Sequence, residues 1–99
     1  MINRLVLSGV IIKTPIRKTS PNGIHHCQFY LEHVSNQIEV GLERQSWCIM
    51  PVIVSGQSEL THSLKKGSKI EVSGFISSHK KRNNIEQLVL HASEIKLTD

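Results

Sequence analysis

Stretches of apolar, mostly branched residues recur along the chain, separated by polar segments that contain proline or glycine. Runs of this length that are rich in Val and Ile favour strands. Within residues 69–78, for example, Ile70, Val72, Gly74 and Ile76 fall on one face, and polar residues occupy most alternate positions. The pattern predicts five strands, at residues 4–13, 25–34, 43–54, 69–78 and 85–97.

The segments between these strands are rich in Pro, Gly, Asn and Ser, which favour turns and loops. Gly9 lies inside the first strand and indicates a bulge or a sharp bend there. The predicted irregular segments are a long loop at residues 14–24, a turn region at residues 35–41 and a polar hairpin tip at residues 79–84.

One segment has the pattern of a short helix. In residues 57–66, Leu60 and Leu64 are four positions apart and therefore share a helix face. Ser58 is a suitable capping residue at the start, and Gly67 is a suitable stop at the end. We therefore expect one or two helical turns, or a loop, between the third and fourth strands.

The order of the predicted elements is three strands, a short helix and two further strands. This order matches an all-β, five-stranded OB-fold barrel, in which a helix lies between strands three and four. A small barrel of the SH3 type is the alternative, although it usually lacks the helix in mid-chain. The length of 99 residues suits a single domain over residues 1–99.

The chain is basic, with 12 Lys and Arg against 8 Asp and Glu. A net charge of +4 fits a polyanion as partner. Three adjacent cations, Lys80, Lys81 and Arg82, follow His79 in the predicted loop between strands four and five, which is a ligand-binding loop of OB-folds. The loop between strands one and two is flanked by three more cations, Lys13, Arg17 and Lys18. We expect both groups to contact nucleic acid; a solvated surface is the other interpretation.

Trp47 is the single tryptophan and lies in the middle of the third predicted strand. If Cys48, Met50 and Val52 face the core, alternation turns Trp47 outward, where its ring can stack on a base. The alternatives are a core position or a dimer contact. Arg44 is a further candidate for nucleic-acid binding. It lies three residues earlier, on the opposite face of a regular strand, so a bulge would be needed to bring it beside the ring.

Several side chains could suggest a metal site, but their spacing matches no zinc pattern and contains no CxxC pair. These residues are His25, His26, Cys27, His33 and Cys48. A hairpin that turns near residues 37–38 would instead place the two cysteines opposite each other as packed neighbours. We therefore expect no metal.

The sequence also lacks the usual signs of an enzyme or of a secreted or membrane protein. There is no Walker-type phosphate loop, no carboxylate motif for two-metal chemistry, and no group positioned to activate a cysteine. The N-terminus does not read as a signal peptide, and no apolar run approaches the ~20 residues of a membrane span. These observations predict a cytosolic, non-enzymatic protein with reduced thiols and no cofactor.

Several stretches resemble the family of primosomal replication protein N (PriB), which is related to bacterial single-stranded DNA-binding protein. The strongest block is Arg44-Gln45, Trp47-Cys48 and Met50-Pro51-Val52-Ile53-Val54-Ser55-Gly56. Further stretches are Asn3-Arg4-Leu5-Val6-Leu7-Ser8-Gly9, Thr14-Pro15, Arg17-Lys18, Ser20-Pro21, Gly23-Ile24, His26-Cys27-Gln28-Phe29, Leu31-Glu32-His33, Gly74-Phe75-Ile76-Ser77, His79-Lys80 and Val89-Leu90-His91-Ala92. The resemblance covers essentially the whole chain in one register.

The resemblance implies an OB-fold homodimer that binds single-stranded DNA and acts in replication restart with the helicase PriA and with DnaT. The chain departs from the family at Val34 and Gln87, where members carry basic residues, and at Leu42, where they carry an aromatic residue. With four aromatic residues, the chain offers few stacking rings. A protein-interaction module that binds nucleic acid weakly is therefore the alternative.

Overall fold

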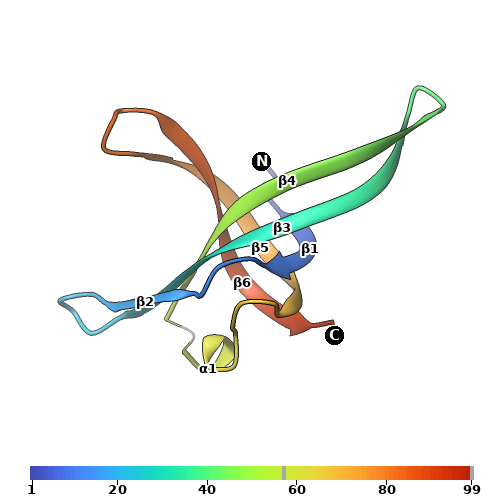
Figure 1. Cartoon of the computed structure of the whole chain (residues 1–99). Coiled ribbons are helices and arrows are strands. Elements are labelled where there is room, and N and C mark those ends of the chain that lie inside the picture. The colour runs from blue at the N-terminus through green and yellow to red at the C-terminus, as the bar shows by residue number, and fades with distance from the viewer. Residues whose placement is uncertain (57, 99) are drawn as a thin grey trace.

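A computed structural model describes residues 1–56 and 58–98, although it does not describe the side chain of Ser58. The chain consists almost wholly of long strands, with one short helix in mid-chain (Figure 1). In chain order the elements are β1 (Leu5–Ile11), β2 (Ile16–Thr19), β3 (His25–Glu39), β4 (Leu42–Ser55), α1 (Ser58–Thr61), β5 (Lys69–Lys80) and β6 (Glu86–Leu97).

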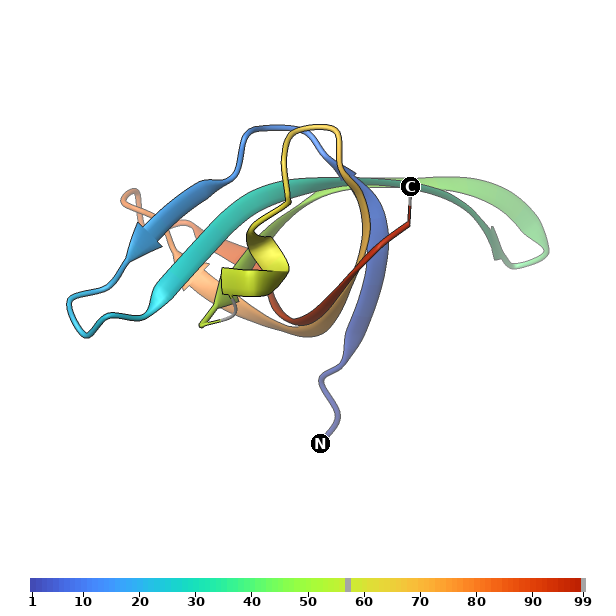
Figure 2. The ribbon, with the colours of Figure 1, turned by 90° about the horizontal axis from the view of Figure 1, so that it is seen from below.

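Five of these strands close into a ring, which Figure 2 shows from below. The order around the ring is β1, β5, β6, β4 and β3, and β3 pairs with β1 to close it. Every pair is antiparallel except β4–β6. The helix lies between the third and fourth ring strands in chain order. This arrangement confirms the predicted OB-fold.

The ladders around the ring differ in length. β3–β4 pair from His26↔Ser55 to Glu39↔Leu42, and β5–β6 pair along almost their whole lengths. By contrast, β1–β3 pair only at Val10↔Glu32 and Ile11↔Leu31, and β4–β6 only at Val52↔Leu90 and Ile53↔His91. The ring therefore consists of two extensive sheets that meet along two short seams.

At Gly9 of β1 and Gly74 of β5, glycine allows the backbones of neighbouring strands to come into close contact. A Cβ on Gly9 would collide with the carbonyl of Glu32, and a Cβ on Gly74 would collide with the carbonyl of His91. The register of β1 against β5 is uninterrupted from Leu5 to Val10, so no bulge accompanies Gly9 in that pairing. A register shift occurs instead between Ser73 and Gly74, where β5 bends against β6.

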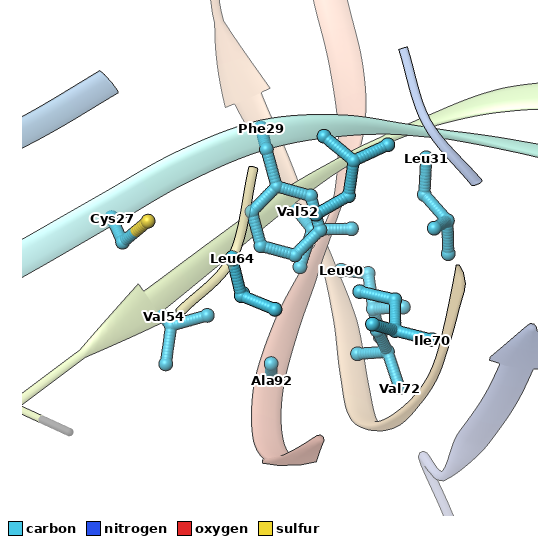
Figure 3. Packing of buried hydrophobic residues seen from close by; sticks show 11 residues of the cluster. Cys27, Phe29, Leu31, Val52, Val54, Leu64, Ile70, Val72, Leu90 and Ala92 are labelled. Atoms are coloured by element: carbon cyan, nitrogen blue, oxygen red, sulfur yellow. The ribbon is translucent and has the colours of Figure 1, made fainter. Parts of the chain in front are cut away.

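The core fills the interior of the ring (Figure 3). Alternate residues of each ring strand point inward, and Leu64 covers the end of the ring beside α1. The buried apolar residues are Ile11, Cys27, Phe29, Leu31, Val52, Val54, Leu64, Ile70, Val72, Leu90 and Ala92.

The hairpin between β3 and β4 is longer than predicted. β3 continues through Glu39, so the predicted turn region at residues 35–41 contains only a two-residue turn, Val40 and Gly41, with φ angles of 52° and 72°. Positive φ at both positions matches the twist of paired strands. Beyond the core, this hairpin forms an arm with both faces exposed (Figure 1), so no hydrophobic alternation marks residues 35–39 as a strand.

The predicted cysteine pairing is wrong because it assumed a turn near residues 37–38. With the turn at residues 40–41, Cys27 lies opposite Val54 and Cys48 lies opposite His33. Cys27 is buried in the core, Cys48 is partly exposed, and both are free thiols.

The predicted loop at residues 14–24 contains the short strand β2, which pairs with β3 from Ile16↔Gln28 to Thr19↔His25. All four β2 residues are exposed, so the strand lacks the apolar alternation by which strands are recognised in sequence. The structure also extends β5 to Lys80, so the hairpin tip begins at Lys81, not at residue 79.

The helix α1 has four residues, about one turn, as expected for one or two turns. It ends at Thr61 and is followed by a turn, so it does not reach the predicted stop at Gly67. Leu64 is buried, but Leu60 is exposed, so the two leucines do not share a buried face. The predicted start at residue 57 and the capping role of the Ser58 side chain lie outside the described residues. Within the described ranges, no helix is long and apolar enough to cross a membrane.

Candidate nucleic-acid interface

A groove of about 270 Å³ lies on the outer surface, between the β3–β4 sheet and the β5–β6 hairpin. Its lining combines exposed and partly buried apolar side chains with three cations from the two predicted binding regions. The cations are Lys13, Lys80 and Lys81, and the apolar lining includes Ile16, Tyr30, Pro51, Ile53 and Val89. A groove with cations at its margin and a ring in its wall is suited to a flexible polyanion with flat groups.

Tyr30 provides an aromatic ring in this groove that the sequence analysis did not single out. Its side chain is 37% exposed, and the Nζ of Lys13 lies 5.3 Å from the centroid of its ring. That distance is within the range of a cation–π contact. Tyr30 lies opposite Pro51 in the β3–β4 ladder. The same alternation that turns Trp47 outward would have placed Tyr30 on the outer face, had the register been known.

Trp47 faces outward, as predicted, and is 59% exposed. It lies opposite Val34 on β3 and shares the outer face of the β3–β4 sheet with Tyr30. Its indole Nε1 donates a hydrogen bond to Oε2 of Glu32, at 3.1 Å. Because Nε1–H lies in the plane of the indole, this bond occupies the ring edge and does not block a ring face.

The cations of the β5–β6 hairpin occupy a well-defined turn. The backbone N–H of Lys81 donates to the carbonyl of Ile85 at 2.9 Å, and that of Asn84 donates to the carbonyl of Lys81 at 3.0 Å. Lys80, Lys81 and Arg82 are exposed, and none forms an ion pair with another described residue. Lys18, from β2, lines the same open hollow as these three side chains. The structure therefore brings together cations from both predicted loops.

Two predicted site residues lie elsewhere. The Nη2 of Arg17 donates to the carbonyls of Thr61 and Leu64, at 2.7 and 3.0 Å, so this guanidinium holds the end of α1. Arg44 lies in the arm, where its Nε is 3.0 Å from Oε1 of Glu39. The β3–β4 register has no bulge, so Arg44 stays on the face opposite Trp47.

Three rings form a stack on the outer face of the β5–β6 hairpin. Phe75 and His91 are parallel within 1°, with centroids 4.7 Å apart, and the Nε2 atoms of His79 and His91 are 2.8 Å apart. One imidazole must donate and the other accept, so at least one ring is neutral. Burial, and then the neighbouring His79, lower the pKa of His91. His79 also lines the groove.

A smaller hollow of about 180 Å³ lies on the α1 side, where Cys27, Arg17 and His62 are among its lining residues. Burial raises the pKa of the Cys27 thiol, which opposes thiolate formation, although the charge of Arg17 acts in the other direction. Within residues 1–56 and 58–98, no three His, Cys, Asp or Glu side chains are grouped so that they could hold a metal ion.

Comparisons with known proteins identify relatives along almost the whole chain. A family model described as "Another single-strand binding protein family" matches residues 3–94. The replication restart protein PriB of Photorhabdus laumondii is 63% identical over 99 residues, which cover 98% of this chain and 94% of that protein. PriB of Pectobacterium carotovorum is 60% identical over 100 residues, covering 99% and 94%.

Solved structures with low sequence identity share the fold. PriB from Ralstonia solanacearum superposes with a TM-score of 0.82 at 19% identity, over the whole of both chains. A deletion mutant of the single-stranded DNA-binding protein from Thermus aquaticus gives a TM-score of 0.82 at 22% identity, over 99% of this chain and 51% of that one. From the family match and the identity to these relatives, we conclude that the chain belongs to the single-strand binding proteins and, among them, to the replication restart protein PriB family.

Proposed function

We propose that the protein binds single-stranded DNA along the groove and the adjoining outer face of the β3–β4 sheet. The observation that carries this proposal is the convergence of cations from two loops on a surface with exposed rings. We assign the phosphate contacts to Lys13, Lys18, Lys80, Lys81 and Arg82. We assign base stacking to Trp47 and Tyr30. We leave Arg17 and Arg44 out of the interface because Arg17 is directed to the end of α1 and Arg44 lies on the face of the sheet opposite Trp47.

The rings favour a single strand over a duplex. In a duplex the faces of the bases are stacked on each other, whereas in a single strand they are available to an aromatic side chain. Tyr30 and Trp47 lie on the same sheet face, four residue pairs apart along the β3–β4 ladder. An extended strand that follows this face can therefore meet both rings.

We further propose that the protein acts in replication restart as a cytosolic homodimer that links single-stranded DNA to the helicase PriA and to DnaT, without catalysing a reaction. The restart role is supported by the names of relatives that are about 60% identical over nearly the whole chain. The two free cysteines fit a reducing cytosol.

A second candidate function, a protein-interaction module with weak nucleic-acid binding, is favoured by the arm. Ile38, Val40 and Leu42 at its end are exposed apolar side chains, and Glu39 and Glu43 lie among them. Apolar and acidic side chains at this end do not suit a polyanion. This end of the arm is better suited to contact with another protein.

A salt titration distinguishes the two functions. We expect a labelled single-stranded oligonucleotide to bind more tightly than a duplex of the same length, as measured by fluorescence anisotropy. If Lys13, Lys18, Lys80, Lys81 and Arg82 all contact phosphates, the slope of log affinity against log salt should be about −3.5, because each contact on a single strand contributes about −0.7. Equal affinity for duplex, or affinity that does not change with salt, would contradict the proposed interface and favour the interaction module.

A further inference from the structure

Glu32 places a carboxylate in the middle of the outer face that we propose to bind DNA. It lies on β3 between Tyr30 and Val34 on the same face and is paired with Ile49 on β4. Val34 and Ile49 are both exposed, and Glu32 itself is partly buried. A negative charge here opposes the binding of phosphates. A carboxylate at this position therefore needs a role in which it accepts hydrogen bonds, which neither a cation nor an apolar side chain can do.

The two carboxylate oxygens of Glu32 are in different situations. Oε2 accepts the hydrogen bond from Nε1 of Trp47, at 3.1 Å. Oε1 makes no hydrogen bond or ion pair with any residue within the described ranges. The first oxygen holds the edge of the indole by this hydrogen bond, and the second remains an acceptor beside a ring that is 59% exposed.

We propose that Glu32 holds the indole of Trp47 in place and selects, for the position stacked on that ring, bases that carry an exocyclic amine. The proposal rests on the proposed function, because it requires a base on Trp47. It adds a specificity-determining residue to a surface otherwise described by cations and rings. A base with an amine on the edge next to Oε1 gains a hydrogen bond there; a base with a carbonyl at that place does not.

The chemistry of the carboxylate sets the direction of the preference. An ionised carboxylate only accepts hydrogen bonds, and the N4 amine of cytosine is a donor. Uracil has a carbonyl oxygen at the same place, and its single N–H is flanked by two carbonyl oxygens that a carboxylate repels. Cytosine and uracil have similar rings, so stacking on Trp47 is nearly the same for both. The comparison of these two bases isolates the contribution of Glu32.

The test compares oligo-deoxycytidine with oligo-deoxyuridine of equal length at neutral pH, using the quenching of Trp47 fluorescence as the measure of binding. For the unaltered protein we expect cytosine to be favoured by about tenfold, the usual scale of one hydrogen bond to a charged group. In Glu32→Gln, the amide oxygen can still accept from Nε1 of Trp47, while the amide N–H₂ is a donor. We therefore expect this variant to favour uracil.

Two further variants separate the roles of charge and position. Glu59→Gln removes the same charge from α1, away from the groove, and should keep the preference for cytosine. Glu32→Leu removes both acceptors, so it should abolish the preference and also lower the fluorescence anisotropy of Trp47 as its ring becomes freer. The fold of each variant is checked by circular dichroism.

The outcomes distinguish this inference from the proposed function. Tight binding of both oligonucleotides by the unaltered protein with no base preference, or the same preference in Glu32→Gln, would overturn the role of Glu32 and leave single-strand binding intact. Failure of the unaltered protein to bind either oligonucleotide would instead refute the proposed function, and the inference with it.

Discussion

At the scale of single residues, Trp47 provides the largest stacking surface. Replacing it with Ala should weaken single-stranded DNA binding by about 1–3 kcal/mol, because one base loses its stacking partner. The ring is mostly exposed, so the free energy of unfolding should change by only about 0.5 kcal/mol. Fluorescence anisotropy with a labelled oligonucleotide measures the first quantity, and thermal unfolding the second. Unchanged affinity in a folded variant would remove Trp47 from the interface.

The orientation of Trp47 could be predicted because strand alternation is a local property. Tyr30 and Glu32 join the same surface only through the β3–β4 register, and that register depends on a two-residue turn in a segment without an apolar pattern. The contact of Arg17 with the carbonyl of Thr61 spans 44 positions in the chain, and no sequence motif marks it. The cations could be listed from sequence, but their partners could not.

At the scale of elements, the hairpin between β5 and β6 carries three adjacent cations in a defined turn. Replacing Lys80, Lys81 and Arg82 together with Ala should flatten the salt slope of binding by about 1.4–2.1, because each phosphate contact contributes about −0.7 for single strands. Affinity should fall for every sequence alike, since phosphates carry no sequence information. Thermal stability should barely change, because all three side chains are exposed.

The matched control for this loop variant removes the same charge elsewhere. Lys65, Lys66 and Lys69 are exposed and lie after α1 and at the start of β5, outside the groove lining. Their joint replacement with Ala should leave the salt slope much closer to that of the unaltered protein. A loop variant with the same slope as this control would show that the hairpin tip does not contact phosphates.

The ring stack on the same hairpin makes folding stability depend on pH. Burial and the proximity of His79 lower the pKa of His91 in the folded protein, so the unfolded chain binds more protons as pH falls through about 6.5, the ordinary value for His. Stability should therefore fall as pH is lowered through this value, and the loss should level off below the pKa of the folded state. At higher pH both states are neutral, and the effect is absent.

The measurement is the melting temperature between about pH 7.5 and about pH 5.5, a range that spans the ordinary His pKa. His91→Gln should lose less stability over this range than the unaltered protein, because the titrating group is gone. His62→Gln changes an exposed histidine near α1 and serves as control. Equal pH dependence in His91→Gln and the unaltered protein would rule out a contribution from the stack.

The elements that could be predicted from sequence are those with one face in the core. All five ring strands were found, because burial of one face imposes alternation on β1, β5, β6 and the central parts of β3 and β4. The missed pieces, β2 and residues 35–39 of the arm, are exposed or nearly so, and their structure depends on pairing with a neighbour. The end of α1 was missed for a related reason, since Arg17 from another element holds the carbonyls there.

At the scale of the whole molecule, we expect a homodimer. A chain of 99 residues buries a modest share of its surface on folding, and association buries more. Val6 and Phe75 are exposed apolar side chains on the outer face of the β1–β5 pair, which lies apart from the groove. Sedimentation equilibrium at micromolar concentration should give twice the mass of one 11.2 kDa chain. A mass near that of a single chain would contradict this prediction.

The whole fold could be predicted from the sequence because the order of the elements restricts the possible topologies. Three strands, a helix and two strands suit few small barrels, and the resemblance to a known family selected one of them. The sequence did not reveal how unequal the ladders are. The lengths of the seams depend on where the strands part from their neighbours, and no local sequence pattern marks these positions.

The two short seams have a mechanical consequence. A sheet joined to its neighbour by only two residue pairs should open at lower free energy than a long ladder, so we expect the β4–β6 seam to act as a hinge at which the ring opens locally. The groove crosses this hinge, with β3 and β4 on one side and β5 and β6 on the other. A ligand that fills the groove touches both halves and favours the closed state over the open one. Binding in the groove and closure of the ring are therefore thermodynamically linked. A bound DNA strand should stabilise the closed ring against local opening at the β4–β6 seam.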